Sequence, residues 1–137
     1  MKKLILIAAS ILIAGITYGQ SIQKGTLIGT HVMTVTLIPG VTMEKYMELF
    51  KTKLIPEMEK NEPTWKVYLL KGVRGESNNS FGLLYVIKSA KDRDKYYNAD
   101  DSDTELGKSF MVKLKPVMDE LGKLGTLATK YTDWVVQ

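Results

Sequence analysis

The amino-acid sequence predicts an α+β domain in which a four-stranded antiparallel sheet carries its helices on one face. Three observations lead to this fold class. Side chains between residues 26 and 37 alternate in character, as in a strand with one buried face. Apolar residues between 43 and 58 recur at three- and four-residue steps, as in an amphipathic helix. Further segments of both kinds then complete the order β-α-β-β-α-β.

The first predicted strand spans residues 26–37 and has one strongly apolar face. One face carries His31, Met33, Val35 and Leu37, and the other carries Thr30, Val32, Thr34 and Thr36. Pro39 and Gly40 follow as a turn that ends the strand.

A helix of about five turns is predicted next, because its apolar side chains form a single stripe. Thr42 is its expected N-cap, and Asn61 and Pro63 are expected to stop it. The stripe consists of Met43, Tyr46, Met47, Phe50, Leu54 and Met58.

The second half of the chain predicts two strands joined by a hairpin, then helices and a last strand. The strands are expected at residues 65–73 and 81–88, with a polar hairpin loop at 75–80 between them. The second of these is apolar on both faces, so it should lie inside the sheet.

Ser89 and Asp92 are spaced to cap a short charged helix that extends to Tyr97, and residues 100–103 form a loop. A longer helix then carries Leu106, Phe110, Leu114, Val117 or Met118, and Leu121. Pro116 is expected to kink this helix or divide it, and Gly122 and Gly125 to close it. The last strand is expected at about residues 126–136.

This order is the ferredoxin-like split βαβ arrangement, in which right-handed crossovers place both helices on the same side of the sheet. The other face of the sheet is then left without cover. Its expected side chains are Thr30, Val32, Thr34, Leu84 and Val86. A face this apolar is unfavourable in water, so we expect a homodimer in which two copies pack sheet against sheet.

Residues 1–19 have the pattern of a cleavable secretory signal peptide. Lys2 and Lys3 precede an uncharged run at residues 4–16, and small residues lie before a cut near Gly19 and Gln20. The run is too short to span a bilayer, which takes about 20 residues, although an uncleaved N-terminal anchor stays open. We therefore expect a secreted or periplasmic protein of a bacterial type, with residues 20–137 as its single domain.

Charge and cysteine content exclude several classes of function. The formal net charge is +4, and two of those charges belong to the predicted signal, so nucleic acid and anionic membrane are not expected partners. The absence of cysteine excludes disulfides, thiolate metal sites and a cysteine nucleophile. The sequence lacks metal-spaced histidines, a phosphate-binding loop and a Rossmann fingerprint, so we expect neither a metal nor a cofactor.

An acidic run at residues 100–105 has part of the spacing of a calcium loop. Asp101, Asp103 and Glu105 match its first three ligand positions. Leu106 stands where that loop requires glycine, and Val112 stands where it requires glutamate. Carboxylates before a helix are also favoured by the helix dipole, so the run does not predict calcium.

Three segments carry a resemblance to a known family. VMTVTLIPG at residues 32–40, YMELF at 46–50 and LIPE at 54–57 resemble the dimeric α+β barrel superfamily. That superfamily includes antibiotic-biosynthesis monooxygenases, haem-degrading monooxygenases and NIPSNAP-like proteins. The resemblance covers most of residues 26–136, and it implies a ligand cavity within each subunit, between the sheet and the helices. The haem-degrading branch uses a helix-borne histidine, whereas His31 lies on a strand.

Six residues are candidates for binding a small apolar or aromatic ligand in such a cavity. They are His31, Phe50, Trp65, Tyr68, Tyr85 and Phe110. The alternative for the aromatic residues is a place in the core or in the dimer interface. The alternative for His31 is a structural histidine that hydrogen-bonds a carbonyl or water. An open pocket that contains both His31 and Tyr85 would favour binding or chemistry.

Three functions follow from these observations. The first is a small-ligand binding protein, exported and homodimeric. The second is a cofactor-light monooxygenase of the antibiotic-biosynthesis type, for which the sequence identifies no catalytic residue. The third is a non-catalytic protein-interaction module. Reductants such as NADH are scarce outside the cytoplasm, and the sequence therefore favours binding over reductant-dependent catalysis.

Overall fold

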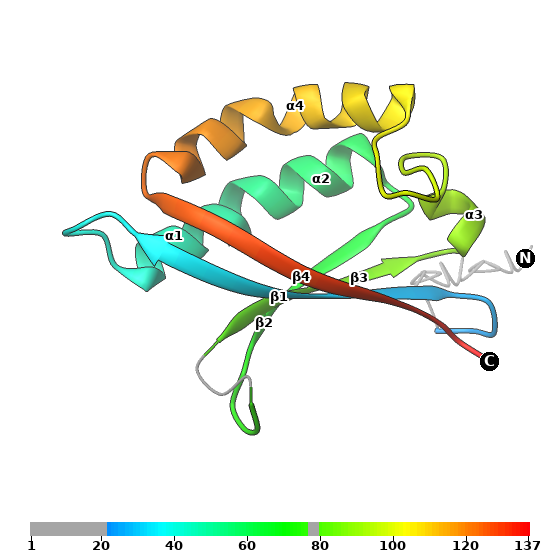
Figure 1. The fold of residues 1–137 in the computed structure, drawn as a ribbon, viewed down its shortest axis with the longest axis horizontal. Helices are drawn as coiled ribbons and strands as arrows, with labels where there is room; N and C mark the ends of the chain where they lie inside the picture. Colours follow the sequence, from blue (N-terminus) through cyan, green and yellow to red (C-terminus); the bar gives the residue numbers. More distant parts are fainter. Residues whose placement is uncertain (1–21, 77–79) are drawn as a thin grey trace, which may run out of the picture.

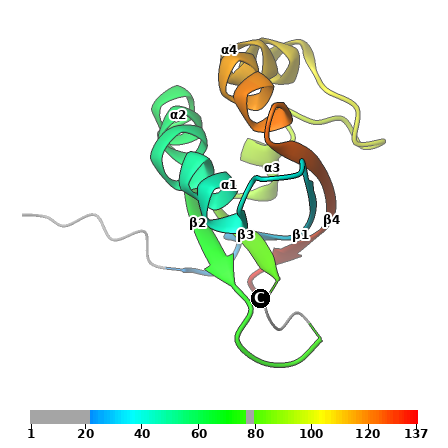
Figure 2. The same ribbon diagram turned by 90° about the vertical axis from the view of Figure 1, so that its left-hand side faces the viewer.

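The computed structural model describes residues 22–76 and 80–137. The predicted signal peptide and residues 77–79 of the predicted hairpin loop lie outside the described residues. Four strands form one antiparallel sheet in the order β2-β3-β1-β4. This is the ferredoxin-like α+β fold that the sequence predicts, with the helices of the described residues on one side of the sheet (Figures 1 and 2).

β1 (Leu27–Leu37) lies inside the sheet, between β3 (Phe81–Ile87) and β4 (Gly125–Val135). β2 (Lys66–Lys71) pairs with the outer side of β3, so β3 is also an inner strand, as predicted. β2 is shorter than the sequence suggests, because its pairing with β3 ends at Lys71. β4 begins at Gly125, where an added Cβ would lie 2.7 Å from the carbonyl oxygen of Thr36.

The first predicted helix is present over its full length, but it changes its winding in the middle. It consists of α1 (Met43–Leu49), a π-helical segment η1 (Phe50–Leu54) and α2 (Ile55–Asn61). Thr42 is the N-cap, and its side chain accepts a hydrogen bond from the backbone N–H of Lys45. The N–H of Ile55 donates to the carbonyl of Phe50, five residues back. Pro56 follows directly, so the wide turn lies where a residue without an N–H enters the helix.

The remaining helices differ from their predicted lengths. α3 (Ala90–Arg93) ends before Tyr97, and Ser89 caps it through the N–H of Asp92, as predicted. α4 (Glu105–Gly122) runs through Pro116 as one helix, so the expectation that this proline divides it is wrong. α4 packs on the sheet side through Phe110, Leu114 and Leu121, whereas Pro116 is exposed. No described helix is long and apolar enough to cross a membrane.

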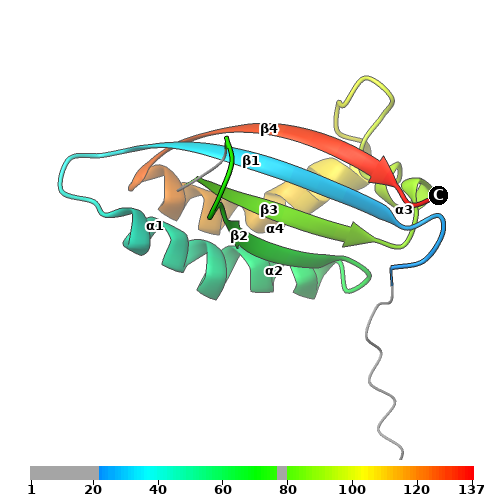
Figure 3. The ribbon, with the colours of Figure 1, turned by 90° about the horizontal axis from the view of Figure 1, so that it is seen from below.

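The core lies between the sheet and the helices. Its most completely buried large side chains are Trp65, Tyr46, Phe50 and Leu121. The other side of the sheet, which we call the open face, is covered by no described helix (Figure 3). Its exposed apolar side chains are Val32, Tyr68, Leu70 and Trp134. The predicted open-face residues Thr30 and Leu84 pair with each other across β1 and β3.

Candidate functional site

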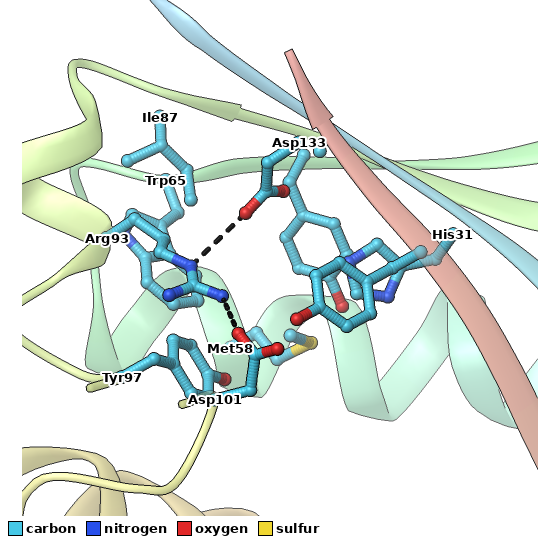
Figure 4. Close-up of a pocket in the computed structure, with 11 residues that line it drawn as sticks. His31, Met58, Trp65, Ile87, Arg93, Tyr97, Asp101 and Asp133 are labelled. Atoms are coloured by element: carbon cyan, nitrogen blue, oxygen red, sulfur yellow. Dashed lines mark hydrogen bonds and ion pairs between the residues drawn. The ribbon is translucent and has the colours of Figure 1, made fainter. Parts of the chain in front are cut away.

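A cavity of about 160 Å³ lies between the sheet and the helices, at the end of the sheet nearest α3 (Figure 4). Strands β1, β3 and β4 contribute to its wall, and so do α2, α3 and the segment that follows α3. Its lining residues are Gly29, His31, Met58, Trp65, Tyr85, Ile87, Arg93, Tyr97, Asp101, Tyr131 and Asp133.

Strand register brings the sheet part of the lining together. Gly29 pairs with Tyr85 on one side and with Asp133 on the other, and His31 pairs with Tyr131. Paired residues in an antiparallel sheet project from the same face, so these five side-chain positions all face the helices.

Gly29 is required by the packing around it. A Cβ added there would lie 3.0 Å from the Oδ1 atom of Asp133 and 3.4 Å from the Cβ of Tyr85. A glycine inside a strand often marks such a close approach. The missing side chain allows the Asp133 carboxylate and Tyr85 to pack directly against the backbone of β1 at the cavity wall.

Aromatic rings form much of the wall. The ring of His31 lies 4.6 Å from that of Tyr85 and 5.4 Å from that of Tyr131, stacked in the second case. The indole of Trp65 meets Tyr85 edge-on at 6.2 Å. Such ring pairs stabilise one another and present flat apolar surface to a ligand.

Burial controls the protonation of two of these rings. It lowers the pKa of His31, although the carboxylate of Asp133 acts in the opposite direction, so the imidazole is neutral at pH 7. It also raises the pKa of Tyr85, whose phenol therefore keeps its proton. The aromatic wall is thus uncharged under physiological conditions.

One guanidinium and its carboxylates form the polar part of the lining. The Nε atom of Arg93 lies 3.2 Å from Asp133, and its Nη2 atom donates to Asp101 at 2.8 Å. The guanidinium also lies over the ring of Tyr97, 4.9 Å from the centroid. Burial opposes the charge of Arg93, but its carboxylate partners outweigh burial and raise its pKa.

Asp101 connects the loop after α3 to this cluster. Hydrogen bonds from Tyr131 and Arg93 lower the pKa of its carboxyl, which is ionised at neutral pH. Asp101 has a φ of 63°, in the left-handed region that aspartate tolerates better than most residues. Asp100 accepts hydrogen bonds from the N–H and hydroxyl of Ser102, which closes the loop on itself.

The acidic run is therefore part of a turn and an ion-pair cluster. Among the described residues, no group of three or more acidic or histidine side chains is placed to hold a metal ion. The cavity also does not fit a haem, since pockets for ligands even of drug size occupy roughly 300–1,000 Å³.

Of the six candidates from the sequence, the structure brings three together at the cavity: His31, Trp65 and Tyr85. Phe50 and Phe110 do not line it, because both are buried in the core. Tyr68 lies on the open face and is 52% exposed, since it pairs with Leu84 on the side of the sheet away from the helices.

Five functional candidates were missed by the sequence analysis: Arg93, Tyr97, Asp101, Tyr131 and Asp133. Arg93 belongs to a charged segment typical of a solvated helix, and Asp101 belongs to the acidic run. The signal for Tyr131 and Asp133 was the period of two in the last strand, which places both on the same face as Leu127.

Trp65 is the most enclosed member of the lining, with 2% of its surface exposed. Its ring contacts Tyr96 at 5.0 Å and Phe110 at 5.5 Å. Within the described part of the chain, its indole nitrogen is buried and has no hydrogen-bond partner. Trp65 thus joins the cavity wall to the aromatic core behind it.

No protein-family model matches this sequence, and no curated protein is significantly similar to it. Among solved structures, the chain is similar to SnoaB, a cofactor-independent oxygenase from Streptomyces nogalater. The TM-score is 0.48 at 11% identity, over 82% of this chain and 94% of that chain. It is also similar to a dimeric protein of unknown function and ferredoxin-like fold from Bacteroides fragilis NCTC 9343. The TM-score is 0.47 at 10% identity, over 82% and 97% of the two chains.

Proposed function

We propose that this chain is a binding protein that holds a small, single-ring compound in the cavity between sheet and helices. The aromatic-lined cavity of about 160 Å³ is the observation that carries this proposal. A cavity of roughly 150 Å³ is large enough for benzene, so the space suits one six-membered ring.

The lining favours a ring over an open-chain compound. The rings of Tyr85 and Tyr131 each contact the ring of His31, so three rings lie together at the cavity wall. Ring stacking adds roughly 0.5–1.5 kcal/mol per pair to the burial of apolar area. A ligand of about nine heavy atoms can then reach a Kd on the order of 1 mM or tighter.

The test is an NMR titration of the protein with 2-phenylethanol, compared between two tyrosine variants. Tyr131→Ala removes a ring from the cavity wall, and we expect it to weaken binding at least fivefold. Tyr68→Ala is the matched control, because Tyr68 is also a half-exposed strand tyrosine, but on the open face. The proposal fails if no single-ring probe perturbs the cavity resonances at 10 mM, or if both variants lose binding equally.

We further propose that the protein is a homodimer joined through the open face. The support is that this face exposes Val32, Leu70 and Trp134, which are 45%, 42% and 59% exposed. An exposed apolar sheet face is unfavourable in water, and a twofold contact buries it on both copies. Light scattering of the protein at micromolar concentration should give twice the mass of one chain. Trp134→Asp should reduce the measured mass to that of a single chain. A monomer in the unaltered protein would contradict the proposal.

Export is a separate proposal, supported by the basic start and apolar run of residues 1–19. Expression of the full chain in a bacterial host should release a protein that begins at Gln20. The mass of the protein in a periplasmic or medium fraction measures this cut. Recovery of an uncleaved chain from the membrane fraction would instead support the N-terminal anchor.

One observation favours an enzymatic alternative, a cofactor-light oxygenation of a phenolic ligand. His31 faces the cavity as a neutral imidazole, so it is able to accept a proton from a bound phenol. Oxygen uptake with phenolic substrates measures this activity. If His31→Ala and Tyr85→Phe leave every rate unchanged, the enzymatic alternative is to be dropped while the binding proposal stands.

A further inference from the structure

We propose that the cavity takes its ring ligand as a cation, a protonated single-ring amine whose ammonium group binds beside Asp133. This inference rests on the proposed function, since it names the charge of the compound that the same cavity holds. The lining contains an arginine, which by itself would favour an anion, but the surrounding carboxylates reverse that preference.

The charges around the cavity sum to a negative value. The described lining residues include one cation, Arg93, and two carboxylates, Asp101 and Asp133. A third carboxylate, Asp94, lies 3.9 Å from the Nη1 atom of the same guanidinium. His31 adds no positive charge at neutral pH, because it is buried. The field in the cavity therefore opposes an anionic ligand and favours a cationic one.

Arg93 is already paired with protein carboxylates. Its Nε and Nη2 atoms are engaged by Asp133 and Asp101, and its side chain is only 15% exposed. One face of the guanidinium is also covered by the ring of Tyr97. A ligand carboxylate at Arg93 would lie beside the protein carboxylates that already surround the guanidinium, and their repulsion opposes its binding.

Asp133 has an oxygen that is placed for a ligand. Its Oδ2 atom faces Arg93, while its Oδ1 atom lies over Gly29, 3.0 Å from the position of an added Cβ. Only glycine fits at this position, because a Cβ there would also lie 3.4 Å from the Cβ of Tyr85, so the bare backbone lets the Asp133 carboxylate lie at the cavity wall next to Tyr85. An ammonium there pairs with a carboxylate oxygen and lies close to an electron-rich ring.

The experiment compares three probes that share a phenyl ring and a two-carbon chain: 2-phenylethylamine, 2-phenylethanol and phenylacetate. At pH 7 they carry a positive charge, no charge and a negative charge. Calorimetric titration of the full domain should show the amine binding at least about tenfold more tightly than the alcohol, and the acid binding most weakly.

Variants locate the effect within the cavity. Asp133→Asn keeps the size of the side chain and removes its charge, so we expect it to abolish the preference for the amine over the alcohol. Asp119→Asn is the matched control, because Asp119 pairs with Lys115 on the exposed side of α4. Circular dichroism confirms that each variant is folded before it is titrated, and the comparison of the three probes requires no variant at all.

The outcomes separate the two proposals. If none of the three probes binds, the proposed function fails and this inference fails with it. If the alcohol binds as tightly as the amine, or if phenylacetate binds most tightly, the inference about charge is overturned while the ring-binding function stands. An unchanged amine preference in Asp133→Asn also overturns the role assigned to that carboxylate.

Discussion

The layer between the sheet and the helices is filled at one end and hollow at the other. The filled end, toward the second half of β1, is closed by the buried side chains Met33, Met47, Phe50 and Leu121. The hollow end, toward the first half of β1, has Gly29 and His31 at the matching strand positions. Met33 and His31 are neighbours on the same face of β1. Met33 packs in the core, whereas His31 borders the cavity.

This difference shows where the fold obtains its stability and where it has room for function. Closely packed apolar side chains, with Phe50 among them, fill the first region, whereas rings and charged groups line the cavity in the second region. Ion pairs to Arg93 take the place of apolar packing at the hollow end. A rigid filled end allows the hollow end to keep a space that costs stability.

The largest expected loss of stability tests the difference between the two ends at Phe50, which is fully buried at the filled end. Phe50→Ala should lower the free energy of unfolding by about 3–5 kcal/mol, because it leaves a cavity in a packed core. Urea denaturation followed by circular dichroism measures this loss. His31→Ala is the paired variant, and it should cost well under half as much, since His31 already borders a space. Equal losses would contradict the distinction between the two ends.

Arg93 should have an intermediate effect, confined to the hollow end. Arg93→Gln leaves the carboxylates of Asp101 and Asp133 without their cation, and it should lower the free energy of unfolding by about 1–3 kcal/mol. Hydrogen exchange should become faster over residues 98–104, which Asp101 ties to Arg93. Lys115→Gln, which breaks an exposed pair on α4, should change stability by less than about 1 kcal/mol. Unchanged exchange in the loop would show that the ion pairs do not hold it.

The smallest effect is the pH dependence that His31 confers. Its pKa in the folded chain lies below the ordinary value, so the unfolded chain takes up a proton first as the pH falls. Stability should therefore be flat above about pH 6.5 and decrease below it. His31→Phe should remove this part of the decrease, as measured by urea midpoints at pH 7.5 and pH 5.5. An identical pH profile in both proteins would show that His31 does not carry it.

The order of elements and the fold were predictable from the sequence, because each rests on a local pattern. Alternation fixed the faces of β1, and the apolar stripe identified the first helix with its cap at Thr42. The π-helical turn was not foreseen. The available signal was Pro56, a proline in the interior of the predicted helix. Of the two effects predicted for Pro116, the division of α4 does not occur, because the packed side chains on both sides of the proline keep the helix in place.

The cavity was predictable only in part. His31, Trp65 and Tyr85 were identified as aromatic residues on strands, which is a property of each residue alone. The ion-pair cluster depends on the meeting of Arg93 with Asp133, which lie 40 positions apart in the sequence. Such a meeting is set by strand register and by the path of the loop after α3, and neither is encoded in a short segment. Phe50 and Phe110 were open to both a ligand and a core role, and the structure buries both in the core.

The positions of the two tryptophans give the molecule built-in optical reporters. The sequence contains only these two, and the sheet separates them: Trp65 borders the cavity, and Trp134 is exposed on the open face. Quenching or a spectral shift from Trp65 would follow ligand uptake, whereas a blue shift from Trp134 would follow association of two copies. With Trp134→Phe and Trp65→Phe, the two processes become separately visible by intrinsic fluorescence, without any attached dye.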